Sequence, residues 1–117
     1  MKKRRQQSDQ RPITLALTPN GQVALCRGSR QGITVEFGPI LQLFAQEDFL
    51  RLEYNLRYMG PAEYFSGHPG RSKIIVHATA PDLYFAFTES EFVELQTLLG
   101  HGLSKLQLLE SAKQNLN

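Results

Sequence analysis

Residues 41–52 read Leu-Gln-Leu-Phe-Ala-Gln-Glu-Asp-Phe-Leu-Arg-Leu, and residues 84–95 read Tyr-Phe-Ala-Phe-Thr-Glu-Ser-Glu-Phe-Val-Glu-Leu. Each stretch passes from a short apolar segment into a pattern of helical period. Acidic residues in a first helical turn are favoured by the helix dipole. At an offset of 43 residues, Phe44 falls on Phe87, Asp48 on Glu91 and Phe49 on Phe92. The chain therefore predicts two similar strand-to-helix junctions, produced either by duplication or by convergence.

The segment before the first junction has the period-two pattern of antiparallel strands. In residues 12–18, Ile13, Leu15 and Leu17 alternate with smaller residues, which predicts one buried face. Asn20-Gly21 favours a tight turn with positive φ values. Further strands are expected over 22–27, 33–37 and 40–44, with turns at 28–32 and 38–39, so this third of the chain is predicted to be a β-meander.

A helix is predicted from residue 46 to the Gly60-Pro61 pair. Its apolar row is Phe49, Leu52, Leu56 and Met59. Two ion pairs spaced i, i+4 are expected on its exposed side, Glu47 with Arg51 and Glu53 with Arg57.

Residues 60–72 are rich in glycine and proline and are predicted to form an extended loop. Long loops in compact domains often carry function. Four residues are candidates for a ligand or partner contact: Tyr64, Phe65, His68 and Arg71. The alternative is a surface crossover that Tyr64 and Phe65 attach to the core.

The last part of the chain predicts a hairpin over 73–78 and 83–87, followed by a helix that begins with the capping box Thr88 to Glu91. Gly100-His101-Gly102 predicts either a kink or two helices, 89–99 and 103–114. Leu98 and Leu108 fall outside the main leucine row, which indicates a second contact. That contact is either the first helix or a second copy, and of these we expect a homodimer formed through the C-terminal helices or the sheet edge.

Together these elements predict an α+β fold: an antiparallel sheet of five to six strands, meander plus hairpin, with two helices packed on one face and a possible ββα-type repeat. The predicted core consists of the inward apolar residues, namely Ile13, Leu15, Val23, Leu25, Ile33, Val35, Phe37, Phe49, Leu52, Leu56, Ile74, Val76, Phe85, Phe87, Phe92, Leu95 and Leu99.

The 117 residues carry a net charge of +2, but the charge is unevenly distributed. Residues 1–11 hold five basic residues and one acidic residue, whereas the rest of the chain is mildly acidic. We expect a basic disordered tail over 1–11 and a single domain over 12–116. Cations near nucleic-acid phosphates give weak, salt-sensitive binding. The candidate nucleic-acid contacts are Lys2, Lys3, Arg4 and Arg5.

Several classes of protein are excluded by composition and spacing. No apolar run reaches the ~18–20 residues of a membrane span, and the N-terminus lacks the apolar region of a signal peptide. Cys26 is the single cysteine, so no internal disulfide or paired-cysteine zinc site is possible. His68, His77 and His101 show no metal-ligand spacing. We therefore expect a cytoplasmic protein without a metal, a cofactor or catalytic residues.

Part of the chain resembles a group of small uncharacterised bacterial α+β domains. The resemblance lies in three segments, Ile33-Thr-Val-Glu-Phe-Gly38, Leu41-Gln-Leu43 and Glu47-Asp-Phe49. The resemblance covers residues 22–59, and no function carries over from it. Members of that group often carry a pair of cysteines near the second strand, whereas Cys26 stands alone here.

The function expected from these features is that of a small non-enzymatic binding or regulatory module that acts through protein contacts. Two alternatives stay open. One is a weak nucleic-acid binder that uses the basic tail, and the other is a small-molecule-binding or catalytic domain centred on the 60–72 loop.

Overall fold

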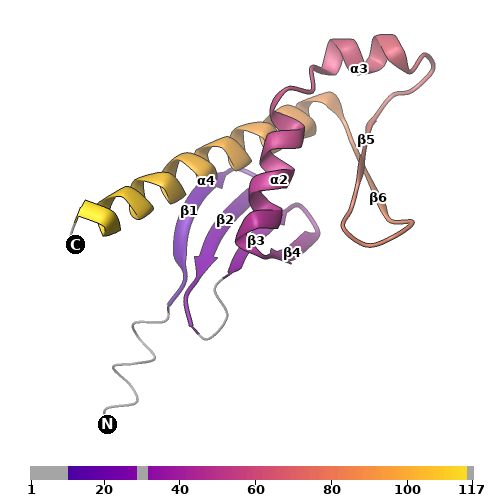
Figure 1. The fold of residues 1–117 in the computed structure, drawn as a ribbon. Coiled ribbons are helices and arrows are strands. Elements are labelled where there is room, and N and C mark those ends of the chain that lie inside the picture. The colour runs from indigo at the N-terminus through magenta and orange to yellow at the C-terminus, as the bar shows by residue number, and fades with distance from the viewer. Residues whose placement is uncertain (1–10, 29–31, 116–117) are drawn as a thin grey trace.

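The computed structural model describes residues 11–28 and 32–115, which form an α+β fold (Figure 1). The elements of this part follow in the order β1, β2, β3, β4, α2, α3, β5, β6 and α4. The predicted tail, apart from Arg11, and the centre of the turn predicted at 28–32 lie outside the described residues.

The predicted meander is confirmed as a four-stranded antiparallel sheet in the order β1-β2-β3-β4. In β3, the alternating residues Ile33, Val35 and Phe37 are buried on one face of the sheet, as their pattern predicts. The strands span β1 Ile13–Thr18, β2 Gly21–Cys26, β3 Gly32–Phe37 and β4 Ile40–Phe44.

A β-bulge in β1 changes which of its residues are buried. Thr14 pairs with Ala24 but Ala16 pairs with Val23, so Leu15 is the extra residue. Because a bulge reverses the alternation of side chains, Leu15 and Ala16 are both buried, whereas Leu17 is 70% exposed. The prediction that Leu17 shares the buried face is wrong for this reason.

The turn between β1 and β2 differs from the predicted one. Neither Asn20 nor Gly21 is among the residues with a positive φ. Gly21 serves close packing instead: a Cβ at this position would lie 2.6 Å from Leu98 Cδ2 and 2.9 Å from Phe37 Cδ1. Helix α4 can therefore approach this corner of the sheet only because the residue is glycine.

The second hairpin, β5 (Ile74–His77) and β6 (Tyr84–Phe87), forms a two-stranded sheet of its own. The predicted single sheet of five to six strands is therefore incorrect in this detail. The hairpin joins the common core through side chains: the rings of Phe37 and Phe87 meet edge to face, with centroids 5.8 Å apart. Because hydrophobic burial is non-directional, this contact needs no backbone pairing between the two sheets.

The predicted loop at 60–72 contains a third helix, α3 (Pro61–Gly67). Pro61 occupies the first turn, where its fixed φ suits a helix and its missing N–H costs nothing. The Tyr64 N–H donates to the Gly60 carbonyl over 2.9 Å. The glycine and proline residues thus delimit a short helix, and the loop begins at His68.

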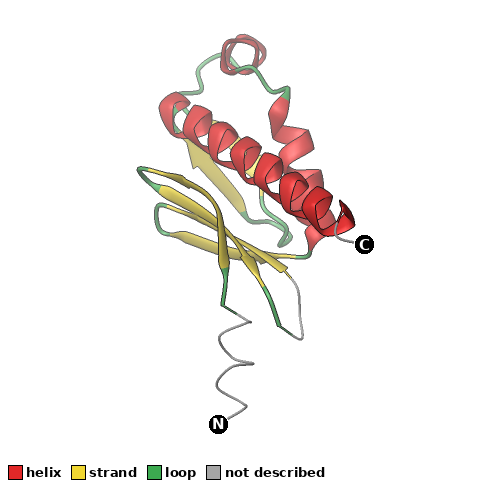
Figure 2. Ribbon diagram, turned by 90° about the vertical axis from the view of Figure 1, so that its left-hand side faces the viewer, coloured by secondary structure: helices red, strands yellow, loops and turns green. Residues whose placement is uncertain are grey.

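Helices α2 (Gln46–Arg57) and α4 (Glu89–Asn115) cover the same face of the four-stranded sheet (Figure 2). Helix α4 packs on β1 and β2, and α2 lies against β3, β4 and α4. The opposite face of the sheet carries no helix of the described chain (Figure 2). None of the described helices has the combination of length and apolarity that crossing a membrane requires.

Helix α4 runs without a break through Gly100-His101-Gly102. The alternative of two separate helices, 89–99 and 103–114, is therefore wrong. Gly102 is buried where the helix crosses the sheet, and a Cβ there would lie 3.2 Å from Val23 Cγ1 and 3.4 Å from Phe49 Cζ. Tertiary packing outweighs the low helix propensity of glycine at this point.

Both predicted strand-to-helix junctions are present, although only the second has a side-chain cap. Phe49 and Phe92 are fully buried, and both helices have acidic first turns. The predicted capping box is formed: the Thr88 N–H donates to Glu91 Oε1 over 2.8 Å, and the Glu91 N–H donates to Thr88 Oγ1 over 3.2 Å.

Every residue of the predicted core belongs to the observed core cluster or packs against it. Leu98, predicted to lie outside the helix row, is fully buried, while Leu108 is exposed. The second contact predicted for Leu98 is thus an intramolecular one, against the β1–β2 corner. The structure adds Ala16, Phe44, Leu98 and Leu106 to the cluster.

Candidate binding cleft

A cleft of about 520 Å³ opens between helix α2, strands β3 and β4, and the β5–β6 hairpin. Figure 1 shows the hairpin extending away from the body of the molecule beside these elements.

The floor of the cleft belongs to the core, and its walls are half-buried apolar side chains. The floor contains Phe37 and Phe87, whose contact joins the two sheets. Apolar residues from six elements complete the surface, namely Val35, Ile40, Phe44, Leu52, Leu56, Val76, Phe85 and Leu95. An apolar partner group placed here would be removed from water on several sides.

The rim of the cleft is polar. Gln42 Nε2 of β4 donates to Thr79 Oγ1, which follows β5, and this hydrogen bond connects the two walls. On α2, Arg51 pairs with Asp48 at 3.0 Å rather than with Glu47, the partner that the i, i+4 spacing predicts. Asp48 lies three residues before Arg51 and within reach on the helix surface. These groups can orient a bound molecule by hydrogen bonds and charge.

The lining residues provide shape and hydrogen bonding more than reactive groups. His77 is the imidazole at the rim and packs against the Tyr84 ring, with centroids 4.8 Å apart. Cys26 is half-buried in β2 and does not line the cleft. In the described ranges, no group of three or more His, Cys, Asp or Glu side chains is placed to hold a metal ion.

The candidate residues of the 60–72 segment lie outside this cleft. Tyr64 and Phe65 are half-buried and pack against the core. The Tyr64 hydroxyl accepts the Ile75 N–H at 3.1 Å and so ties α3 to β5. These two side chains therefore attach the segment to the core, as the alternative interpretation predicts.

His68 stacks on the Tyr64 ring, with centroids 4.1 Å apart and planes 16° from parallel. Its Nδ1 donates to the Tyr64 carbonyl at 2.8 Å, which fixes the ring. Arg71 is exposed beyond the end of α3. The structure thus brings together Tyr64 and Phe65 of α3 and His68, the C-cap of that helix. The contact role of all four residues stays a prediction. The candidate nucleic-acid contacts Lys2, Lys3, Arg4 and Arg5 lie outside the described residues.

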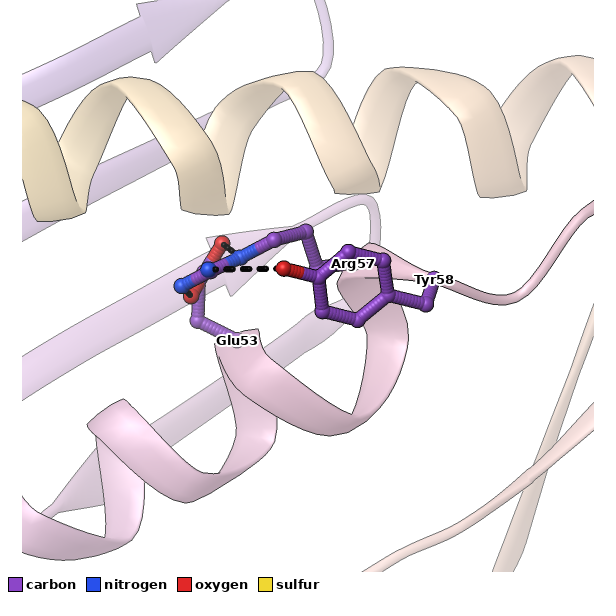
Figure 3. Close-up of polar contacts among 3 residues, drawn as sticks. All are labelled: Glu53, Arg57 and Tyr58. Carbon is purple, nitrogen blue, oxygen red and sulfur yellow. Dashed lines mark hydrogen bonds and ion pairs between the residues drawn. The ribbon is translucent and has the colours of Figure 1, made fainter.

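Glu53 and Arg57 form the predicted ion pair, but not on an exposed face (Figure 3). Glu53 is only 5% exposed. It accepts from Arg57 Nε at 3.0 Å and from Arg57 Nη2 at 2.5 Å, beside a small hollow between α2 and α4. A buried carboxylate requires such a partner, because leaving it unpaired costs several kcal/mol, on the order of 3–5.

This ion pair organises an exposed aromatic surface on α2. Hydrogen bonds from Arg57 to Glu53 and then to Tyr58 raise the pKa of the guanidinium above its ordinary value. Arg57 Cζ lies 5.6 Å from the Tyr54 ring centroid and 5.5 Å from that of Tyr58. Both tyrosines are exposed. This surface lies on α2 apart from the cleft lining.

Comparisons of the chain with protein-family models, with curated proteins and with solved structures gave no match. The functional interpretation therefore rests on the cleft itself. No local pattern in the sequence predicts the cleft, because its lining residues come from six elements spread between Val35 and Leu95. The one available signal was the polar Gln42 inside an apolar strand.

Proposed function

We propose that this protein is a non-enzymatic binding module that acts through protein contacts, and that the cleft between α2, β4 and the β5–β6 hairpin receives apolar side chains of its partner. The observation that carries the proposal is the apolar cleft of about 520 Å³, which opens onto the core. Ligand pockets in proteins have volumes of about 300–1,000 Å³, so the cleft is large enough to enclose bulky apolar side chains.

The composition of the cleft supports a protein partner. Its floor accepts bulky apolar groups, and its rim offers the Gln42–Thr79 hydrogen bond and the Asp48–Arg51 ion pair around that floor. An apolar centre surrounded by polar groups is the usual arrangement of a protein interface. The same proposal places the protein in the cytoplasm, consistent with its single cysteine.

The proposal is tested by closing the mouth of the cleft in the full-length chain. Thr79 lines the cleft and its neighbour Ala80 does not, although both are exposed. Thr79→Trp places an indole at the rim, and Ala80→Trp is the matched control. We expect Thr79→Trp to weaken binding of the apolar dye 8-anilinonaphthalene-1-sulfonate at least tenfold, and Ala80→Trp to leave it unchanged.

Affinity capture from the native lysate with the same three proteins then identifies the class of partner. A protein retained by wild type and Ala80→Trp but lost with Thr79→Trp supports the proposal. Unchanged dye binding and unchanged captured proteins in Thr79→Trp contradict it. Loss of dye binding without loss of any protein indicates a small-molecule site. Salt-sensitive nucleic-acid binding that disappears on deletion of residues 1–11 indicates the tail alternative.

A further inference from the structure

Strand β4 is a free edge of the four-stranded sheet, and its sequence, Ile-Leu-Gln-Leu-Phe, carries no charge. In the described part of the chain, its backbone pairs with β3 alone. Edge strands of this kind present unpaired N–H and C=O groups to other chains unless charge, proline or a bulge prevents it. The other edge, β1, has a bulge and is packed by α4.

The pairing register shows which backbone groups of β4 face outward. Phe37 and Ile40 flank a two-residue loop and pair directly, so Ile40 exchanges hydrogen bonds with β3. Because these bonds alternate along an antiparallel strand, Gln42 and Phe44 also bond to β3. The N–H and C=O groups of Leu41 and Leu43 therefore point to the free edge.

Leu41 pairs with Glu36 and Leu43 with Thr34, so their side chains lie on the face of the sheet opposite to the buried one. No described helix covers that face (Figure 2). They are 69% and 61% exposed. The outward backbone N–H and C=O groups of these residues, and their apolar side chains, thus have no partner within the described part of the monomer. A second chain that pairs along β4 would satisfy both.

The sequence of β4 is symmetric in chemistry about Gln42: two apolar residues precede it and two follow it. A twofold axis requires that a surface be complementary to itself. Antiparallel pairing of two β4 strands centred on Gln42 places Leu41 opposite Leu43 of the other copy, and Ile40 opposite Phe44. In this register, the outward backbone N–H and C=O groups of Leu41 and Leu43 form hydrogen bonds with the other copy.

We propose that two copies of this chain associate through β4, forming a continuous antiparallel sheet of eight strands, with the four leucines packed together on its open face. The dimer does not depend on the proposed cleft function, because pairing uses the outward backbone and outer-face leucines of β4. The cleft, in contrast, is lined by the inner-face side chains Ile40, Gln42 and Phe44.

Sedimentation and light scattering of the full-length protein over a range of concentrations test the association. Wild type is expected at twice the monomer mass of 13.3 kDa at high concentration. The double substitution Leu41→Lys and Leu43→Lys adds like charges at the pairing edge and should give a monomer. Leu17→Lys, an equally exposed leucine on the same face at the other edge, is the matched control and should remain dimeric.

The register is tested by cysteine cross-linking in a Cys26→Ser background. Gln42→Cys places two thiols opposite each other at the twofold axis and should form an intermolecular disulfide on mild oxidation. Leu41→Cys places its thiols two residues out of register, so its cross-linking should be at least tenfold slower. A wild-type monomer at all soluble concentrations, a Leu17→Lys protein as monomeric as the double variant, or equal cross-linking of both cysteines would overturn the proposal.

Discussion

At the scale of single residues, Gly21 shows how one position limits the approach of two elements. The β1–β2 corner contacts Leu98 of α4 and Phe37 of β3 at distances that leave no room for a side chain. Gly100, in contrast, lies in the same long helix as Leu98, and a Cβ added there would meet nothing within 4 Å among the described residues. The two glycines therefore have opposite roles.

Gly21→Ala is expected to destabilise the protein by about 1–3 kcal/mol, the usual range for an overpacked site. Gly100→Ala is expected to stabilise it by about 0.5–1 kcal/mol, because alanine loses less backbone entropy in a helix. Urea denaturation of both variants measures these free energies of unfolding. Equal effects of the two substitutions would contradict the packing assigned to Gly21.

At the scale of elements, polar side chains fix how α4 sits on its neighbours. Gln96 Nε2 donates to the carbonyls of Leu56 and Met59, both at 2.8 Å, at the C-terminal end of α2. Glu94 accepts from Thr18 Oγ1 at 2.7 Å and from the Asn20 N–H and Nδ2 at 2.8 Å. Helix α4 is thereby attached to α2 and to the β1–β2 turn.

The Glu94 contacts predict a pH dependence of stability. Hydrogen bonds from Thr18 and then Asn20 lower the pKa of Glu94 below its ordinary value of 4.5. A carboxylate with a depressed folded pKa contributes stability that is fully present above the unfolded value and is lost as the pH falls through the folded one. The contribution is therefore expected to persist down to about pH 4.5 and to disappear below it.

The measurement compares urea unfolding of wild type and Glu94→Gln between neutral pH and pH 3, a range that brackets the ordinary pKa of 4.5. The advantage of wild type over Glu94→Gln should be constant near neutrality and should shrink in acid. The other carboxylates titrate equally in both proteins, so the difference isolates Glu94. An advantage that grows as the pH falls would contradict this assignment.

At the scale of the whole molecule, two sheets share one core, but their strands differ in how many neighbours they pair with. Strands β2 and β3 each pair on both sides, whereas β5 and β6 pair only with each other. The hairpin is held by the Phe37–Phe87 contact, the Tyr64–Ile75 hydrogen bond and the Gln42–Thr79 hydrogen bond. It forms one wall of the cleft.

Native-state hydrogen exchange should therefore show the hairpin opening before the central strands. We expect amides that bond β5 to β6 to exchange roughly tenfold faster than those that bond β2 to β3, which corresponds to about 1.4 kcal/mol in opening free energy. Mass spectrometry of peptides covering the two pairs measures the rates. Equal protection would show that the hairpin opens only with the whole molecule.

The sequence by itself determined most of the local structure and most of the core residues. Alternating residues such as Ile33, Val35 and Phe37 specify their strand, and the capping box at Thr88 specifies where α4 begins. Such signals depend only on neighbours in the chain, so they are readable without a structure. The α3 helix was missed because its glycine and proline residues are turn formers that also delimit short helices.

Only the tertiary structure decided which strands pair and which faces are covered. The cleft is assembled from α2, both sheets and α4, and the packing of α4 on the inner face of the sheet buries Leu98 while Leu41 and Leu43 stay exposed. Apolar periodicity predicts which face of each element is buried. It does not predict which other element covers that face, because hydrophobic contact is non-directional. The candidate binding surfaces of this protein arise from those long-range choices.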